Sequence, residues 1–229
     1  MLKYNIIITN YRRPTNIPRI INACLACERV HLIFLIDNSL NDQLETEHSR
    51  LLKCVNYIKM PFNSGAGYRF DFAYDQAFQG TLCLDDDIFL NPEQIDALIA
   101  HSILDPDRLH GIWGQKIEYR SDGLWLQGGI RNIEAELDIL NRVYCFQRSV
   151  VEDAKALAND LGLLDWSRLG PFDDILMSMG SRLRPRCHSL GSITECQTSN
   201  DADIAVWRTK NFHKLRTDLV KRILARRAQ

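Results

Sequence analysis

Three consecutive aspartates, Asp85, Asp86 and Asp87, follow the short apolar run from Thr81 to Leu84. If the chain stays extended through them, Asp85 and Asp87 point to one face and Asp86 to the other, so the first and third carboxylates can share a ligand. Adjacent carboxylates repel one another unless a cation or hydrogen-bond donors compensate. A dication such as Mn²⁺ or Mg²⁺, held by one or two carboxylates and by phosphate oxygens, meets this need. The alternative is that the aspartates belong to an acidic loop or a helix cap. For three aspartates without other motifs, this alternative and the metal site are equally well supported.

A second acidic pair, Asp173 and Asp174, stands at the start of a helix predicted from about Phe172 to Met179. Acids in a first helical turn are favoured by the helix dipole, which is the ordinary explanation. The functional alternative is a catalytic carboxylate that acts as a general base for a hydroxyl or stabilises a positively charged reacting centre.

A glycine-containing loop, Asn63 to Arg69, follows a predicted strand from Val55 to Met60. Its glycines let the backbone approach a ligand closely, and Arg69 could meet a phosphate or a sugar hydroxyl. The loop has neither the P-loop pattern nor the dinucleotide-binding pattern, so a simple strand-to-helix turn stays open.

The first half of the chain alternates short β-branched runs with helical patterns. The strands expected are Tyr4–Thr9, Leu32–Ile36, Val55–Met60 and Thr81–Leu84, and a helix begins at Asn91-Pro92. Such alternation predicts a doubly wound parallel sheet with helices on both faces. Ligands bind beyond the carboxyl ends of these strands, which here are followed by Thr9–Pro14, Asp37–Ser39 and Asp85–Asp87.

The pattern changes after about residue 105. A hairpin is expected from Gly111 through a turn at Arg120–Gly123 to Gln127, so the sheet becomes mixed. Helices from about Val151 to Leu161 and from about Phe172 to Met179, and a β segment near Cys187–Ile193, precede a basic C-terminal helix. One domain over residues 1–229 is expected, with a nucleotide-binding half to about residue 104 and an acceptor-binding, catalytic half beyond it.

The composition is that of a globular protein, with 229 residues, 45% hydrophobic content, 25% charged content and a net charge of -1. Disorder, collagen and coiled coil are excluded. No apolar run approaches the roughly 20 residues of a membrane span, and no secretory leader is visible. Seven cysteines, an odd number, predict reduced thiols and a cytoplasmic location. We interpret Cys24 and Cys27 as helix core, with a redox or metal site as the minority alternative.

The charge is uneven. Arg208 to Gln229 holds eight basic residues and one acid, a local +7 that leaves -8 elsewhere. Leu215, Leu219, Ile223 and Leu224 recur at helical spacing, which favours a helix packed on the core with a basic outer face. The alternative is a peripheral contact with the inner membrane face. Nucleic-acid binding is not expected, because the remainder is acidic and no such motif occurs.

Together these motifs resemble a glycosyltransferase of the GT-A fold. Ile6–Pro14 is similar to the opening strand and loop of family 2-like transferases, and Leu82–Asp87 resembles their DXD motif. Exostosin-like transferases also have a strand that ends in three aspartates, a helix that starts with Cys-Glu and a late H-x-x-R motif. Phe172–Ile175 resembles that helix start, although Phe172-Asp173 replaces Cys-Glu. His213–Arg216 resembles the late motif. Both resemblances imply an α/β, Rossmann-like GT-A fold with a central, mostly parallel mixed sheet and helices on both faces.

The resemblance also implies residue roles. Asp87 would bind the metal, Mn²⁺ or Mg²⁺, and Asp85 the ribose or a metal-bound water. Asp174 would be the catalytic carboxylate, with Asp173 beside it, and His213 would reach the metal. The donor-binding set implied is Thr9, Tyr11, Arg12, Asp37, Asn63, Arg69, Asp85, Asp86 and Arg216, in which Asp37 meets the uracil or ribose and Arg216 the diphosphate.

The implied function is metal-dependent transfer of a hexosyl or N-acetylhexosaminyl group from a nucleotide sugar, most simply a uridine diphosphate sugar, to a hydroxyl of a glycan or other acceptor. One alternative is a sugar-nucleotide nucleotidyltransferase, although Asn10–Pro14 lacks the glycines such an enzyme needs. The other is a catalytically silent glycan-binding protein, which has little use for so many acids in one cleft. His188 is the second choice for the metal-proximal role, and Trp125 could stack on an acceptor sugar. We interpret the remaining histidines as structural or surface residues: His31, His48, His101 and His110.

Overall fold

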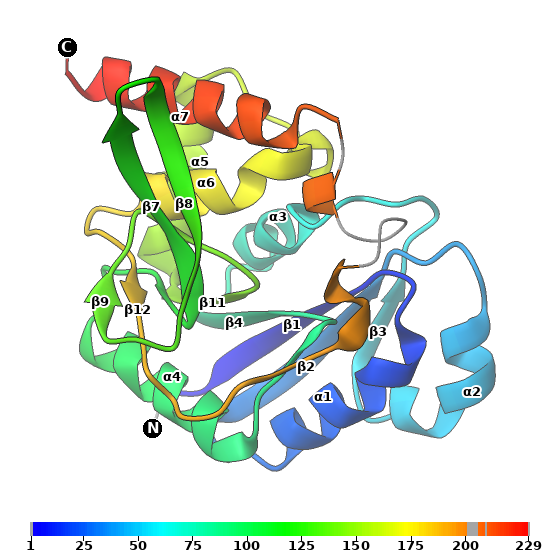
Figure 1. The fold of residues 1–229 in the computed structure, drawn as a ribbon. Coiled ribbons are helices and arrows are strands. Elements are labelled where there is room, and N and C mark those ends of the chain that lie inside the picture. The colour runs from blue at the N-terminus through cyan, green and yellow to red at the C-terminus, as the bar shows by residue number, and fades with distance from the viewer. Residues whose placement is uncertain (1, 201–205, 209, 229) are drawn as a thin grey trace.

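The computed structural model describes residues 2–200, 206–208 and 210–228 (Figure 1). The strands are β1 (Tyr4–Asn10), β2 (Val30–Asp37), β3 (Asn56–Lys59), β4 (Gly80–Asp85), β5 (Ile88–Phe89), β6 (His110–Gly111), β7 (Trp113–Arg120), β8 (Gly123–Arg131), β9 (Ala135–Glu136), β10 (Ile139–Leu140), β11 (Val143–Gln147), β12 (Arg186–Cys187) and β13 (Thr194–Glu195). The α-helices are α1 (Ile17–Leu25), α2 (Gln43–Leu52), α3 (Tyr68–Asp75), α4 (Pro92–Leu104), α5 (Arg148–Asp160), α6 (Asp173–Gly180) and α7 (Phe212–Arg227). Short 3-10 turns are η1 (Pro14–Asn16), η2 (Trp166–Arg168), η3 (Gly170–Phe172), η4 (Gln197–Asn200) and η5 (Val206–Arg208).

The central sheet has eight strands in the order β3-β2-β1-β4-β11-β6-β12-β9. β1 lies between β2 and β4 and runs parallel to both, and β2 pairs in parallel with β3. The chain fills one side of β1 with β2 and β3 before it crosses to β4 on the other side, so the strand order reverses at β1. The predicted doubly wound sheet is confirmed, and its expected ligand crevice lies at the carboxyl ends of β1 and β4.

The pairing register brings the ends of these strands level. Thr9 of β1 lies opposite Ile36 of β2 and Asp85 of β4, and Asn10 lies opposite Asp37. β1 is buried along its whole length, as its β-branched run predicts for a central parallel strand. The polar residues that follow each strand are therefore delivered to one edge of the sheet.

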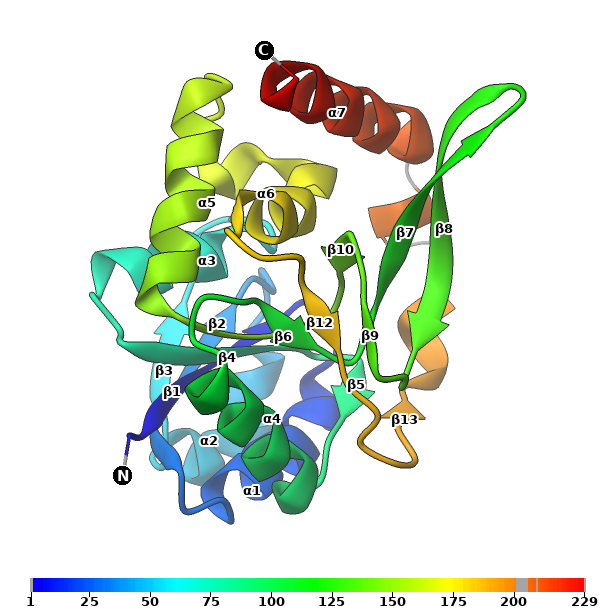
Figure 2. The ribbon, with the colours of Figure 1, turned by 90° about the vertical axis from the view of Figure 1, so that its left-hand side faces the viewer.

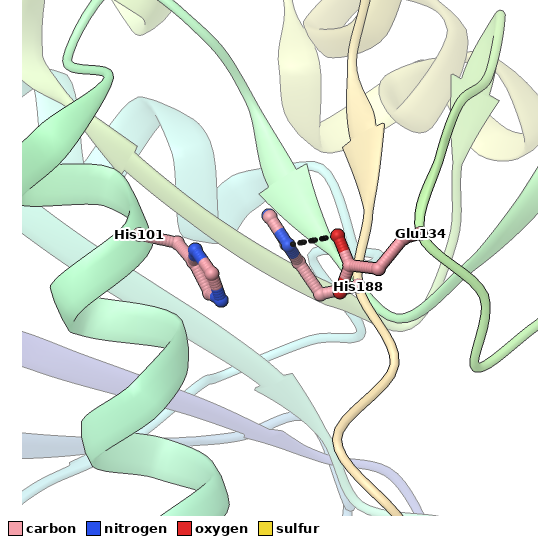
Figure 3. A group of neighbouring side chains, drawn as sticks. All are labelled: His101, Glu134 and His188. Atoms are coloured by element: carbon pink, nitrogen blue, oxygen red, sulfur yellow. Dashed lines mark hydrogen bonds and ion pairs between the residues drawn. The ribbon is translucent and has the colours of Figure 1, made fainter.

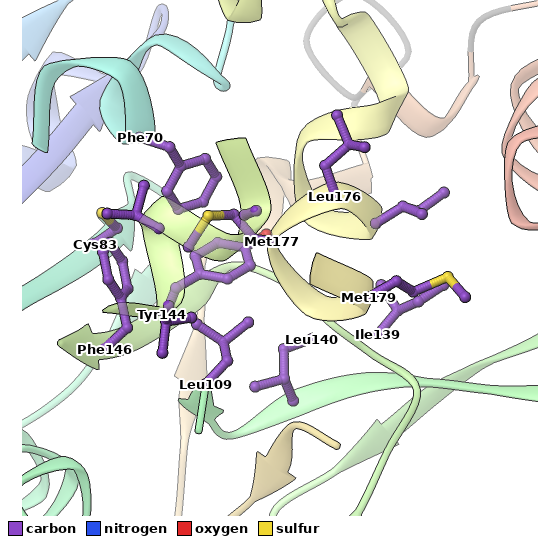
Figure 4. Close-up of a cluster of buried hydrophobic side chains, with 14 of the residues drawn as sticks. Phe70, Cys83, Leu109, Ile139, Leu140, Tyr144, Phe146, Leu176, Met177 and Met179 are labelled. Atoms are coloured by element: carbon purple, nitrogen blue, oxygen red, sulfur yellow. The ribbon is translucent and has the colours of Figure 1, made fainter. Parts of the chain in front are cut away.

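Helices cover both faces of this sheet, as Figures 1 and 2 show. α1, α2 and α4 lie on one face, and α3, α5, α6 and α7 lie on the other. Alternate residues of β1 supply both cores: Ile6 and Ile8 enter the first, and Ile7 enters the second. Figure 4 shows the second core, in which Phe70 of α3 and Met177 of α6 meet side chains of the sheet.

The second half contains an element that the sequence did not predict. β11, with Val143 to Phe146 buried, runs antiparallel between β4 and β6. It passes into α5 without a glycine or proline boundary, so its apolar run resembles the start of that helix. The predicted mixed sheet and hairpin are confirmed, but β8 extends to Arg131 rather than Gln127.

The basic C-terminal helix joins the second core by packing against α6, η3 and β8. Leu219, Val220 and Ile223 of α7 are buried, whereas Leu215 is exposed. This agrees with the packed-helix interpretation of the basic segment, of which Thr209 and Gln229 lie outside the described residues. Over the described ranges, none of the helices has the length and apolar character that crossing a bilayer requires.

The cysteines of the CxxC pattern belong to the first core. Cys24 lies in α1 and Cys27 lies just beyond its end, and both side chains are buried. Burial raises the pKa of both thiols, which keeps them protonated and poorly suited to redox or metal chemistry. The helix-core interpretation is supported.

Candidate active site

A cavity of about 470 Å³ lies at the carboxyl ends of β1 and β4. Its walls come from the loops after β1, β2, β3 and β4, from β7, and from the N-terminal ends of α6 and α7. Of the residues selected from the sequence, it is lined by Thr9, Tyr11, Asn63, Arg69, Asp85, Asp86, Asp87, Asp173, Asp174, His213 and Arg216. The fold therefore brings both acidic clusters and the late H-x-x-R residues to one place.

Asp37 does not line this cavity. Its carboxylate is fully buried and accepts hydrogen bonds from Asn10 Nδ2 at 2.8 Å, from the backbone N–H of Ser39 at 3.0 Å and from the Tyr57 hydroxyl at 3.0 Å. These donors come from β1, from the loop after β2 and from β3. Asp37 thus links β1, the loop after β2 and β3, and both of its carboxylate oxygens already accept hydrogen bonds from within the protein.

The loop after β1 presents Arg13, rather than Arg12, to the acidic turn. Arg12 adopts a left-handed φ of 61° and does not line the cavity. Arg13 Nη1 lies 2.5 Å from Asp86 Oδ1, and its Nη2 lies 3.7 Å from Asp87 Oδ2. The backbone N–H of Tyr11 also donates to Asp86 at 2.6 Å. The compensating donors that three adjacent carboxylates require come partly from this loop.

The chain does not stay extended through the three aspartates. β4 ends at Asp85, and Asp86 and Asp87 form a turn before β5. Asp86 is drawn inward by the β1 loop, and burial raises the pKa of its carboxyl to about 7 against the opposing charge of Arg13. Asp86 therefore anchors the turn to the β1 loop.

Arg69 is the buried cation that joins the two acidic clusters. One Nη contacts Asp85, and the other lies 3.4 Å from Asp173 Oδ2. The guanidinium also lies over the rings of Tyr144 and Phe70, at 4.6 and 4.9 Å from their centroids. The side chain is 2% exposed, so its charge serves these carboxylates inside the protein more than a ligand in solvent.

Two side chains, Arg216 and Asn141, orient the carboxylate of Asp174. Arg216 Nη1 lies 2.6 Å from Asp174 Oδ1 and donates to the Pro171 carbonyl at 2.7 Å, while its Nη2 donates to Gln115 Oε1 at 2.7 Å. Asn141 also donates to Asp174 Oδ2. A carboxylate held by α7 and by the loop before β11 is preorganised at the cavity wall, as a catalytic acid or base must be.

Asp173 gives a prediction for the pH dependence of stability. Burial raises the pKa of this carboxyl to about 6, from a reference value of 3.8, with Arg69 opposing and Asp174 adding to the effect. The folded state therefore binds more protons than the unfolded state between these values. We expect urea unfolding to show that wild type loses stability relative to Asp173→Asn as pH rises from about 4 to about 6.

Above that range the stability difference between wild type and Asp173→Asn should be constant. Asp160→Asn, which changes an exposed carboxylate at the end of α5, is measured in parallel as the control. A difference that grows in the opposite direction would contradict the assignment.

Gly67 allows the loop after β3 to pack closely against η2 and the start of α6. A Cβ at this position would lie 2.4 Å from the backbone oxygen of Trp166 and 3.1 Å from Asp173 Cβ. We expect Gly67→Ala to lower the free energy of unfolding by about 1–3 kcal/mol, because backbone must move to admit the methyl group. Gly128→Ala is the matched control, because only the flexible Gln115 side chain lies near its new Cβ. Equal unfolding midpoints for the two variants would contradict this account.

Several lining residues were not selected from the sequence: Arg13, Asn38, Trp113, Gln115, Asn141, Arg142 and Tyr144. Arg13 and Asn38 adjoin selected residues and could have been included with their loops. Asn38 accepts from the backbone N–H and the hydroxyl of Ser64, which links the second and third loops. The others lie on β7 and around β11, where no sequence signal marks their approach to the strand ends.

Asp85, Asp87 and His213 do not form a ready set of three ligands. Among the described residues, the group of His, Cys, Asp and Glu whose ligand atoms lie within 4.8 Å of one another contains none of them. Mg²⁺ and Mn²⁺ nevertheless commonly use one or two carboxylates together with substrate phosphates. Asp85 and Asp87, on one cavity wall, suit an ion that is completed by a diphosphate. His188 and Trp125 do not line the cavity.

The chain is similar in structure to several solved proteins. Residues 1–349 of TarS from S. aureus superpose with a TM-score of 0.57 at 16% identity, covering 87% of this chain and 62% of that one. The same TarS fragment in complex with UDP gives 0.54 at 16% identity, covering 84% and 59%. GalNAc-T7 with UDP, GalNAc and Mn²⁺ gives 0.53 at 11% identity, covering 67% and 37%. The chain thus spans less than two thirds of each, and the likeness establishes a shared fold.

No curated protein sequence matches the chain. The family model described as "Glycosyl transferase family 2" matches residues 5–153, which is more than half of the chain and includes β1 to β11 with the acidic turn. This match favours the family 2-like resemblance over the exostosin-like one. With the doubly wound sheet and the GT-A architecture in agreement, the chain belongs to glycosyl transferase family 2 and is a glycosyltransferase.

Proposed function

We propose that the protein transfers a sugar from a uridine diphosphate sugar to a hydroxyl of a glycan or other acceptor, with a divalent metal and with inversion at the anomeric carbon. The observation that carries this proposal is one cavity in which Asp85 and Asp87 face the same space as Asp173 and Asp174. The first pair suits a metal-diphosphate, and the second suits proton transfer. TarS has been solved with UDP-GlcNAc, and GalNAc-T7 with UDP and Mn²⁺, which supports the donor class and the metal.

The nucleoside would lie against the loops after β1, β2 and β3. Tyr11 presents a ring at the cavity wall, and Asn38 takes the place that the sequence assigned to Asp37. The side-chain NH₂ of Asn38 donates to the Gly65 carbonyl over a long 3.4 Å, so it can also serve a uracil carbonyl. In this arrangement the half of the chain to about residue 104 binds the donor, and the half beyond it contributes the acceptor side.

The metal would be held by Asp85 and Asp87 together with the diphosphate. When bound, Mn²⁺ or Mg²⁺ supplies charge that stabilises the diphosphate leaving group. His213, exposed at the start of α7, lines the same cavity and would approach the diphosphate. Arg216 is 3% exposed and committed to Asp174, so we assign it to positioning that carboxylate rather than to the diphosphate.

Asp174 would be the general base. It would take the proton from the acceptor hydroxyl as that oxygen bonds to the anomeric carbon and the bond from that carbon to the diphosphate oxygen breaks. Asp173 lies beside it, and its own pKa is raised by burial, with the charge of Asp174 adding to the effect. Attack from the face opposite the diphosphate inverts the anomeric configuration.

A thermal-shift experiment tests the donor site. Wild type is measured with uridine, guanosine, cytidine and deoxythymidine diphosphates, each with and without MnCl₂. A ligand at about 100 times its Kd stabilises by about 2.7 kcal/mol, or roughly 5–11 °C for a chain of this size. We expect a Mn²⁺-dependent shift with uridine diphosphate that is lost in Asp87→Asn and kept in Asp160→Asn. The absence of a shift with every nucleotide would refute the proposal.

The stereochemistry has a separate test. Proton NMR of freshly formed product, with a uridine diphosphate sugar as donor, should show the anomeric configuration opposite to that of the donor. Retention of configuration would remove Asp174 from the role of base.

A further inference from the structure

A second cluster of ligand-type side chains lies outside the proposed active site. Figure 3 shows His101 of α4, Glu134 of the loop between β8 and β9, and His188 just after β12. His188 lies between the other two: its ring stacks on that of His101 at a centroid distance of 3.8 Å, and its Nδ1 lies 3.3 Å from Glu134 Oε2. One ligand atom from each residue lies within 4.8 Å of the others.

Hydrogen bonding around His188 determines where its proton lies. His110 Nε2 lies 2.8 Å from the Asp105 carbonyl, which can only accept, so this nitrogen carries the proton. With a neutral His110, Nδ1 is an acceptor, and it lies 2.9 Å from His188 Nε2. His188 Nε2 must then carry a proton and donate it to His110 Nδ1. The remaining nitrogen of a neutral His188, Nδ1, therefore bears a lone pair.

This lone pair faces the carboxylate of Glu134. Two acceptors at 3.3 Å repel each other unless a proton or a metal cation lies between them. Arg186 Nη2 lies 3.6 Å from Glu134 Oε2 and balances part of the carboxylate charge, but it does not serve the imidazole.

We propose that His101, Glu134 and His188 form a Zn²⁺ site that joins α4 to β12 and to the loop after β8. Zn²⁺ at 2.0–2.1 Å from each ligand in a tetrahedron places neighbouring ligand atoms roughly 3.3 Å apart, which is the separation of His188 Nδ1 and Glu134 Oε2. Two histidines and one glutamate leave a fourth position for water.

The surroundings also suit a metal-binding histidine. A ligating histidine commonly donates its other N–H to a protein acceptor that fixes its orientation. His188 does so toward His110, which is in turn anchored on the Asp105 carbonyl. The His101 ring must turn about its side-chain bonds to aim a nitrogen at the ion, because two parallel stacked rings cannot both point at one atom. His101 is only half-buried, which leaves room for this turn.

The three ligands are far apart in the sequence, so an ion here would act as a cross-link. It would hold the helix that follows the acidic turn against the short strands at the far side of the sheet. Metal binding would therefore appear as folding stability and is independent of sugar transfer.

The test measures Zn²⁺ binding directly. Protein stripped with a chelator is titrated with ZnCl₂ in excess MgCl₂, which occupies the carboxylate site, and all proteins carry Cys54→Ser because an exposed thiol also binds zinc. We expect one tight equivalent and a Zn²⁺-dependent rise in Tm for the parent protein. His101→Ala and Glu134→Gln should each weaken binding at least tenfold and abolish the rise in Tm.

Matched controls separate this site from others. His31→Ala and Glu28→Gln change exposed residues of the same types outside the cluster, and Asp87→Asn changes the proposed donor site. All three should bind Zn²⁺ as the parent does. The proposal is overturned if the parent shows no Zn²⁺-dependent stabilisation, if either cluster variant keeps the parent affinity, or if Asp87→Asn is the variant that loses binding.

Discussion

Replacing Asp174 by asparagine should lower kcat by about 10²–10⁴, the range that a positioned general base contributes. Asparagine has nearly the same shape and its side-chain oxygen can still accept from Arg216 Nη1, but it cannot accept the hydroxyl proton, so the chemical step is lost. Initial rates of sugar transfer from uridine diphosphate sugar measure the effect. Mn²⁺-dependent stabilisation by uridine diphosphate should persist in the same variant, because Asp174 does not contact the proposed metal-diphosphate.

Asp173→Asn is the internal comparison. It removes the neighbouring charge but not the proposed base, so its kcat should fall less than that of Asp174→Asn. A larger loss in Asp173→Asn would transfer the role of base to Asp173, whose pKa of about 6 also suits proton transfer near neutral pH. Similar kcat values for Asp174→Asn and wild type would remove the pair from the chemistry.

Replacing Arg69 by methionine should lower the free energy of unfolding by about 3–5 kcal/mol. The substitution removes a buried cation from between Asp85 and Asp173 and leaves both carboxylates without its charge. For a protein of this size the change corresponds to a fall in Tm of roughly 6–20 °C. Urea unfolding at neutral pH measures it.

A double variant separates the charge effect from lost packing. Arg69→Met with Asp173→Asn removes one of the uncompensated carboxylates, so it should be more stable than Arg69→Met alone. Arg168→Met is the surface control: its side chain is 86% exposed, and the expected change is within about 0.5 kcal/mol. If Arg69→Met is no less stable than Arg168→Met, the two carboxylates do not depend on Arg69.

Much of the site follows from one regularity of parallel sheets. The apolar runs around Ile7, Leu35 and Leu84 identify buried strands. Because these strands are parallel, the chain leaves each of them at the same edge of the sheet. The polar residues after each run therefore had to be neighbours. This is why residues chosen from separate motifs, such as Asp85 and Asn63, line the same cavity.

Choices between adjacent residues did not follow from that regularity. The expected donor-binding set contains Arg12, but the next residue, Arg13, is the partner of Asp86, and Arg12 has a left-handed φ. Asp37 was chosen over Asn38, yet Asn10, Ser39 and Tyr57 satisfy its carboxylate inside the protein. Loop dihedrals and cross-loop hydrogen bonds decide such cases, and neither is periodic in sequence.

By itself, the sequence determined the doubly wound sheet, the edge at which its ligand site lies and the acidic residues that would carry the chemistry, because hydrophobic periodicity and strand direction are local properties of the chain. Only the tertiary structure decided which charges are paired. Arg69 meets Asp173 across 104 positions, Arg216 meets Asp174 across 42, and His188 meets Glu134 across 54. These contacts depend on how α3 and α6 pack on the sheet, how α7 packs against α6 and how β12 pairs within the sheet, which no local pattern encodes.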